Sequence, residues 1–140
     1  MKLDLLSFKK AVKSLNAALK DFNKDNDNDY IRDAVIQRFE YTYELSYKFL
    51  RRYLQLSLQN ANEVDEMSFS DIIRSASAKG LLLNNLEKWI EYRKMRNTTS
   101  HTYDEAKADA VIAIAPNFLK DAKFLLKTLD KKGDKQWELI

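Results

Sequence analysis

The polar stretch from Arg96 to Tyr103 contains the side chains best suited to chemistry in this chain, among them its only histidine, His101. A guanidinium such as that of Arg96 can bind phosphate through two hydrogen bonds and stabilise charge on a phosphorane. An imidazole titrates near neutral pH, so His101 could take a proton from a 2′-hydroxyl or give one to a leaving oxygen. The pair is the minimum set for metal-independent RNA cleavage. One histidine cannot easily be both base and acid, but a two-fold dimer that joins two His101 residues would remove that difficulty.

The same residue types also have structural explanations. A cation in the last turn of a helix, such as Arg96, complements the helix dipole, and a histidine in a loop is usually only a polar surface residue. Glu40 and Glu44 lie one turn apart and could work as acid and base or bind metal, but ion pairing on a helix surface, with Lys48 one turn further on, is the more common explanation. Because the chain has no cysteine and one histidine, we expect no metal site, and no motif indicates a cofactor.

The segments on both sides of this stretch have the apolar periodicity of helices. One helix is expected from about Leu5 to Phe22, and a short one follows a Ser68 cap and ends before Gly80. Another runs from a cap at Asn84 or Asn85 to about Arg96. Residues 61–67 are expected to form a loop.

The last helix is expected to begin at a capping box formed by Thr102 and Glu105. Pro116 lies within it and should kink it near Ile112, because proline removes one backbone donor. From Lys131 onward the chain is expected to be a tail, either frayed or docked through Trp137.

Residues 30–60 contain neither glycine nor proline and are expected to form one long helix with two apolar faces. Such a helix either lies at the centre of a bundle or packs inward with one face and meets a second protomer with the other. Its tyrosines suit an interface, although an ordinary core explains them too. The two faces carry the following residues: Val35, Phe39, Tyr43, Leu50 and Leu54; and Ala34, Tyr41, Leu45, Phe49 and Leu56.

Composition limits the fold and the location of the protein. Two glycines and one proline in 140 residues leave few turns, which excludes a hairpin-rich β fold and a glycine-rich phosphate loop. We therefore expect an all-α, up-and-down antiparallel bundle of four main helices and one short helix, with one domain (1–130) and a tail (131–140). No apolar run has the length of a signal peptide or a membrane span, so we expect a cytoplasmic protein without a membrane partner. The net charge of +3 allows a nucleotide or RNA partner without arguing for one.

Two motifs together resemble a known family. Residues 96–105, RNTTSHTYDE, resemble the Arg-x4-His-x-Tyr signature of the HEPN superfamily. Residues 37–48, QRFEYTYELSYK, resemble the nucleotidyltransferase substrate-binding protein family within it. The number and the lengths of the expected helices agree with that family over nearly the whole chain.

The resemblance implies a helical homodimer that works beside a separately encoded minimal nucleotidyltransferase and completes a nucleotide or substrate cleft. Besides the motif residues, Asn97, Ser100, Glu44 and Tyr47 are then candidates for supporting or binding roles. In related toxin–antitoxin pairs the helical protein is an endoribonuclease toxin. In such a pair the residues matched by Arg96 and His101 would be catalytic, and Tyr103 would be the hydroxyl that the antitoxin modifies with AMP (AMPylation) to silence the toxin.

Three hypotheses follow from the sequence. The first, which we favour, is a nucleotide- or substrate-binding subunit without catalysis of its own. The second is the metal-independent endoribonuclease regulated at Tyr103, so the sequence leaves open whether the chain is an enzyme. The third is a plain helical dimer whose polar turn only caps helices. No DNA partner is expected in any of them.

Overall fold

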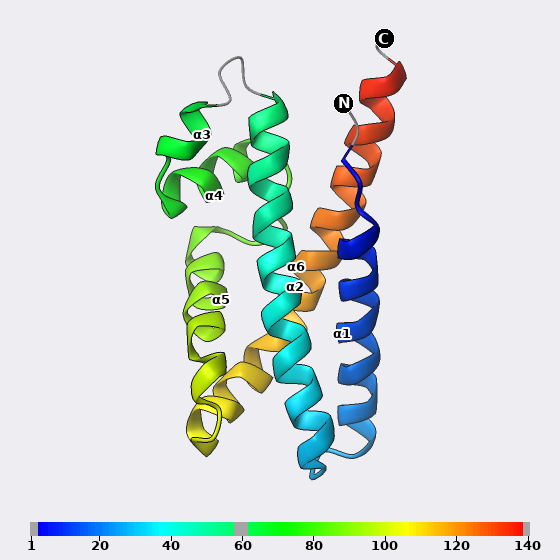
Figure 1. The fold of residues 1–140 in the computed structure, drawn as a ribbon, viewed down its shortest axis with the longest axis vertical. Coiled ribbons are helices and arrows are strands. Elements are labelled where there is room, and N and C mark those ends of the chain that lie inside the picture. Colours follow the sequence, from blue (N-terminus) through cyan, green and yellow to red (C-terminus); the bar gives the residue numbers. More distant parts are fainter. Residues whose placement is uncertain (1–2, 58–61, 139–140) are drawn as a thin grey trace.

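The computed structural model describes residues 3–57 and 62–138, with side chains as far as Lys132. All regular structure in these two stretches is helical, which confirms the predicted all-α class. Figure 1 shows α1, α2, α5 and α6 running alternately down and up, as predicted for an antiparallel bundle. The elements are α1 (Leu6–Lys24), α2 (Asp29–Ser57), α3 (Asn62–Glu66), α4 (Phe69–Ala78), α5 (Leu86–Thr98), the 3₁₀ turn η1 (Thr99–His101) and α6 (Glu105–Glu138).

The long helix α2 lies at the centre of the fold. It packs against α1 on one side, against α3, α4 and α5 on the other, and against α6 behind it (Figure 1). This position accounts for its two apolar faces. The face that begins with Val35 and Phe39 is buried throughout. On the face that begins with Ala34 and Tyr41, Phe49 is buried and the other residues are half-buried. On that second face Tyr41 shares a 2.6 Å hydrogen bond between its hydroxyl and that of Ser14 on α1.

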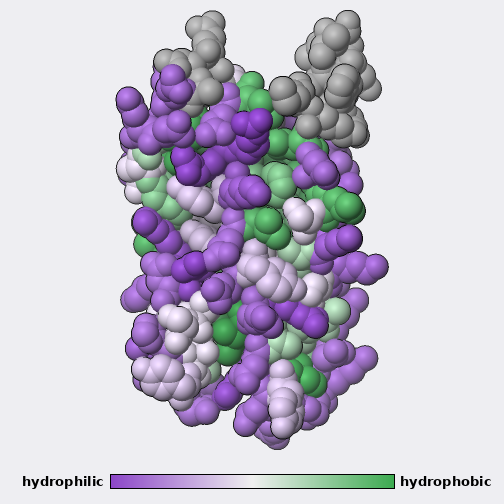
Figure 2. Space-filling view, viewed as in Figure 1, coloured by the Kyte–Doolittle hydropathy of each residue, from purple (hydrophilic) through white to green (hydrophobic). Residues whose placement is uncertain are grey.

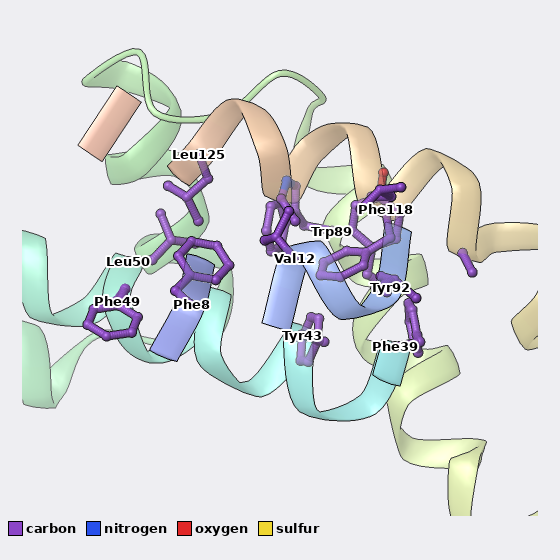
Figure 3. Close-up of a cluster of buried hydrophobic side chains, with 14 of the residues drawn as sticks. Phe8, Val12, Phe39, Tyr43, Phe49, Leu50, Trp89, Tyr92, Phe118 and Leu125 are labelled. Carbon is purple, nitrogen blue, oxygen red and sulfur yellow. The ribbon is translucent and has the colours of Figure 1, made fainter. Parts of the chain in front are cut away.

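Aromatic rings form the middle of the core (Figure 3). Phe118 of α6 meets four of them edge-on or tilted, with ring centroids 5.1 to 6.2 Å apart, which is the range in which aromatic pairs add stability beyond the buried area. These four rings belong to Phe39 and Tyr43 of α2 and to Trp89 and Tyr92 of α5. The cluster therefore ties α2, α5 and α6 together.

Several helix ends lie where the sequence predicted them. The Ser68 hydroxyl accepts a hydrogen bond from the Asp71 amide at 3.1 Å, and the Asn85 side chain accepts one from the Lys88 amide at 3.2 Å. Gly80 ends α4 with a φ of 75°, in the left-handed region that glycine enters without strain. The amides of Gly80 and Leu81 bond back to the Ser77 and Ala76 carbonyls, as in a Schellman motif.

The capping box predicted at Thr102 and Glu105 is wrong. The cap is Asp104, whose carboxylate accepts a hydrogen bond from the Ala106 amide at 2.9 Å. The turn η1 delays the start of α6 by two residues, and the Thr102 hydroxyl instead donates to the Thr99 carbonyl at 3.2 Å. Glu105 does not reach back along the chain but accepts a hydrogen bond from Arg32 of α2.

A second correction concerns residues 61–67, which were expected to form a loop. Residues 62–66 form the short helix α3, because Val64 is buried against Leu54 of α2 and Ile72 of α4. This small apolar cluster is separate from the main core. It holds α3 and α4 against the C-terminal half of α2.

The last helix continues through Pro116 to Glu138. Proline lacks the N–H that would bond to the Ile112 carbonyl. In Figure 1 α6 runs obliquely behind α2 and becomes steeper towards its C-terminal end. The kink near Ile112 itself stays a prediction. The backbone of residues 131–138 is part of this helix. The expected docking of Trp137 lies outside the described side chains.

Candidate functional site

Arg96 lies in the last turn of α5 and pairs with Glu44 of α2. The Arg96 Nε donates to Glu44 Oε1 at 3.1 Å, and its Nη2 contacts the same oxygen. This hydrogen bond is the main reason that the pKa of Arg96 is raised, against the opposing effect of desolvation. Both side chains are partly exposed, so the pair adds little to stability, but it fixes the direction of the guanidinium.

Arg96 lines a hollow of about 250 Å³ between α2, α4 and α5, which we call the Arg96 hollow. The predicted binding residues Glu44, Tyr47 and Asn97 line it as well. The other lining residues are Tyr43, Phe69 and Arg93. The structure therefore brings four of the predicted site residues together.

Sequence reasoning assigned no site role to Arg93 or Phe69. The Arg93 guanidinium lies 4.6 Å from the centre of the Phe69 ring, within cation–π distance. Arg93 lies on α5, three residues before Arg96. Phe69 opens α4, and no local pattern in the sequence places that helix beside α5.

The turn η1 carries the other candidate residues to the end of the bundle. The Thr99 hydroxyl donates to the Arg96 carbonyl at 2.7 Å, which continues α5 directly into the turn. Ser100 and His101 are exposed. Tyr103 is 84% exposed, and its ring centroid lies 6.2 Å from that of His101, with the two rings nearly perpendicular.

Tyr103 lines a second hollow, of about 330 Å³, between the start of α2 and the turn before α6. A hydrogen bond of 2.8 Å from Arg32 of α2 to Glu105 of α6 holds these two helix starts together. The Arg32 side chain is only 17% exposed, while that of Glu105 is 73% exposed. The ion pair therefore holds the start of α6 against the start of α2, next to the turn that carries His101 and Tyr103.

The predicted site residues accordingly divide into two groups within one protomer. Arg96, Asn97, Glu44 and Tyr47 surround the Arg96 hollow, while His101 and Tyr103 lie together on the turn. His101 lines neither of the two hollows. Joint action of Arg96 and His101 through a two-fold dimer stays a prediction.

Residues 3–57 and 62–138 contain neither a metal-binding cluster nor a membrane-spanning helix. In this part of the chain no three histidine, cysteine, aspartate or glutamate side chains are grouped so that they could hold a metal ion. None of the helices described there is long and apolar enough to span a membrane.

Comparison with known proteins identifies the family of this chain. Residues 3–131 match the model of the family described as "Nucleotidyltransferase substrate binding protein like". The chain is 43% identical over 105 residues to the "Probable ribonuclease HepT" of Haemophilus influenzae, a match that covers 75% of this chain and 71% of that protein.

Two solved structures have a similar fold. One is a Haemophilus influenzae protein described as having the fold of a substrate binding domain of a nucleotidyltransferase. It matches with a TM-score of 0.85 and 37% identity over 91% of this chain and 99% of its own. The other, a protein from Thermus thermophilus, matches with a TM-score of 0.69 and 31% identity over 87% and 98% of the two chains. The chain therefore belongs to the family of nucleotidyltransferase substrate binding protein-like proteins.

Proposed function

We propose that this chain is the nucleotide- or substrate-binding subunit that works with a separately encoded minimal nucleotidyltransferase. The Arg96 hollow carries the proposal, because the guanidinium groups of Arg93 and Arg96 and the aromatic rings of Tyr47 and Phe69 line it together. Guanidinium groups bind phosphate, and nucleobases stack on aromatic rings and on guanidinium planes. A nucleotide is the class of ligand that uses both features.

The comparisons support the same assignment. The family is named for substrate binding beside a nucleotidyltransferase, and so is the fold of the solved relative from Haemophilus influenzae. The family model covers the part of the chain that forms the hollow, from α2 to α5. We infer that the nucleotidyltransferase partner delivers or receives the nucleotide there.

Isothermal titration of AMP into the purified chain tests the hollow. We expect Arg96→Ala to weaken AMP binding by roughly 10- to 100-fold, because a hydrogen bond to a charged group contributes about 1.5–3 kcal/mol. Arg74→Ala is the matched control, since Arg74 is an exposed arginine of α4 that does not line the hollow. Equal affinities for the two variants, or no AMP binding by the wild type, would contradict the proposal.

A pull-down assay tests the partner. The tagged chain should retain a minimal nucleotidyltransferase encoded beside it, and the same prey should not bind to an unrelated helical protein of similar charge. If the nucleotidyltransferase passes through the column, the chain is not its subunit.

A second function, metal-independent endoribonuclease, is favoured by two observations. A relative at 43% identity is named a probable ribonuclease, and His101 and Tyr103 are exposed side by side at the end of the bundle. Under this second function Arg96 stabilises the phosphorane, and His101 of each protomer transfers protons in a shared cleft of a homodimer. The exposed Tyr103 phenol would accept AMP from ATP through a new oxygen–phosphorus bond, with pyrophosphate as the leaving group.

Expressing wild type and His101→Ala separately distinguishes this function from pure binding. A ribonuclease toxin slows growth and degrades cellular RNA, and the variant does neither. Light scattering on the purified chain measures whether the required dimer forms. Equal growth and equally intact RNA for the two proteins would rule out the ribonuclease.

A further inference from the structure

Helix α5 carries both guanidinium groups of the Arg96 hollow but has only a narrow contact with the core. Of its 13 residues only Trp89 and Tyr92 are buried. Figure 2 shows that the side of the molecule formed by α5, on the left, is mostly hydrophilic. A broad apolar stripe holds a helix in one rotation about its axis. Two buried side chains alone determine the rotation of α5 much less well.

The two buried side chains of α5 differ in their polar contacts. The indole Nε1 of Trp89 is buried without a hydrogen-bond partner in the described part of the chain, so packing alone holds this ring. The Tyr92 hydroxyl donates a 2.5 Å hydrogen bond to Asp121 of α6. Figure 3 shows both rings beside Phe118 of α6, with ring centroids 6.2 and 5.2 Å from the centroid of that ring. The two residues share a neighbour, but only Tyr92 is oriented by a hydrogen bond.

The Asp121 carboxylate also holds the start of α5. The backbone amide of Asn84 donates to Oδ1 of Asp121 at 3.0 Å, and the Asn84 side chain donates to Oδ2 at 2.6 Å. Asn84 directly precedes Asn85, the cap of α5. Because the start and the middle of α5 bind the same carboxylate, Asp121 fixes both the position of α5 along its axis and its rotation relative to α6.

Asp121 is buried without a cation to balance its charge. Its side chain is fully buried and forms no ion pair among the residues that the structure describes. Buried charged groups can often be replaced by packed apolar side chains without loss of stability. Apolar side chains do not supply direction, whereas a helix that turns away from a buried carboxylate leaves donors and acceptors unpaired. The role that this leaves for Asp121 is the orientation of α5.

The orientation of α5 decides where its guanidinium groups lie. Arg93 and Arg96 follow Tyr92 by one and four residues, so a rotation of Tyr92 about the helix axis is passed on to both. A rotation by about 20° moves a side-chain tip that lies about 6 Å from the axis by about 2 Å. Hydrogen-bond distances span only about 0.5 Å. A small rotation would therefore break the 3.1 Å hydrogen bond from Arg96 to Glu44 and displace the guanidinium.

We propose that Asp121 and Tyr92 are positioning residues of the Arg96 hollow. Their hydrogen bond fixes the rotation of α5, and that rotation holds the guanidinium groups of Arg93 and Arg96 where one phosphate can contact both. Neither Asp121 nor Tyr92 lines the hollow, so both act through α5. The inference rests on the proposed function in one respect, because it takes a nucleotide phosphate as the ligand of the hollow.

Isothermal titration with AMP compares Tyr92→Phe with Trp89→Phe. The first variant removes the hydrogen bond to Asp121, and the second reduces packing on the same helix without removing a hydrogen bond. We expect Tyr92→Phe to weaken AMP binding by about 5-fold, because a displaced guanidinium loses part of its charged hydrogen bond, and Trp89→Phe by less than about 2-fold. Far-UV circular dichroism checks that both variants are folded. Equal losses in the two variants would reduce the effect to a general loosening of the fold and overturn the proposal.

The same comparison in an Arg96→Ala background separates positioning from a purely structural role. Once the guanidinium of Arg96 is gone, Tyr92→Phe has much less left to displace, so its effect on AMP affinity should fall below about 2-fold. A residue that only stabilises the fold would weaken AMP binding by the same factor in both backgrounds. That result would refute the positioning role.

Nitrogen-15 NMR reports on Arg96 without any ligand. The Nε–H signal of Arg96, identified by its loss in Arg96→Ala, reflects the hydrogen bond to Glu44. We expect Tyr92→Phe to shift this signal and to speed its exchange with water, and Trp89→Phe to leave it nearly unchanged. An unchanged signal in Tyr92→Phe would overturn the proposal even if AMP binding weakened.

The two measurements also separate this inference from the proposed function. If the wild type binds no AMP but the Arg96 signal responds to Tyr92→Phe, the proposed function fails while the orientation of Arg96 by Tyr92 stands. If AMP binds and neither its affinity nor the signal responds to Tyr92→Phe, the proposed function stands and the positioning role fails. A shifted signal with unchanged AMP affinity would also refute the positioning role, because the orientation of Arg96 would then not matter for binding.

Discussion

Asp121 of α6 is fully buried and accepts three hydrogen bonds, although sequence reasoning gave it no role. The Asn84 amide and side chain donate to it at 3.0 and 2.6 Å, and the Tyr92 hydroxyl donates at 2.5 Å. Asn84 directly precedes the cap of α5, and Tyr92 lies one turn before Arg96. The carboxylate therefore fixes α5 on α6 at two points and holds the helix that carries Arg96.

Asp121→Ala leaves three donors without their acceptor. A buried unsatisfied donor costs about 1–3 kcal/mol, and the Tyr92 hydroxyl, which is fully buried, bears the full cost. Asn84 is half-buried and can regain water in part. We therefore expect a loss of about 3–5 kcal/mol in the free energy of unfolding, a large share of the 5–15 kcal/mol typical of a domain.

Urea unfolding followed by far-UV circular dichroism measures this loss. Asp130→Ala is the control on the same helix, because the exposed ion pair of Asp130 with Lys9 should contribute less than about 1 kcal/mol. Tyr92→Phe removes one donor and should cost about 1–3 kcal/mol, and a double-mutant cycle should show coupling between Tyr92 and Asp121. A loss below about 1 kcal/mol for Asp121→Ala, or additive effects in the cycle, would refute the reasoning.

Three other outcomes are expected. Glu44→Gln removes the carboxylate that competes with a phosphate for the guanidinium of Arg96, so AMP binding measured by calorimetry should tighten severalfold. Weaker AMP binding would mean that Glu44 is needed to orient Arg96. Arg32→Ala breaks the ion pair at the start of α6 and should speed hydrogen exchange at the first amides of that helix, while it lowers the free energy of unfolding by at most about 1 kcal/mol. Unchanged exchange would show that the ion pair does not hold the turn. Burial raises the pKa of the phenols of Tyr43 and Tyr92, so above about pH 10 the unfolded state releases protons that the folded state retains, and the free energy of unfolding falls as the pH rises. Tyr92→Phe should make this alkaline fall in the free energy of unfolding shallower. An identical fall in the wild type and the variant would contradict this cause.

The fold was predictable because its signals are local. Apolar residues at helical spacing set the long helices, and Ser68, Gly80 and Asn85 mark the ends that their side-chain or backbone properties predict. The start of α6 was misplaced because Thr102 and Asp104 both suit a cap, and the choice depends on the 3₁₀ turn that the chain makes before them. No local pattern reveals that turn.

The site was predictable only in part. A motif named the residues, but it did not predict that Arg96 pairs with Glu44, because the ion pair considered for Glu44 was with Lys48 on the same helix. Phe69 and Asp121 escaped because their roles come from contacts between helices that are distant in the sequence. The division between the Arg96 hollow and the His101–Tyr103 turn depends on where side chains point after α5 ends, which spacing alone does not determine.

A crystal structure of the chain with bound AMP tests the central claim most directly, because that claim places a nucleotide in the Arg96 hollow. The account predicts that the phosphate contacts the guanidinium groups of Arg96 and Arg93 and that the base packs on the ring of Tyr47 or Phe69. AMP bound only beside His101 and Tyr103, with the Arg96–Glu44 pair unchanged and the hollow empty, would contradict it.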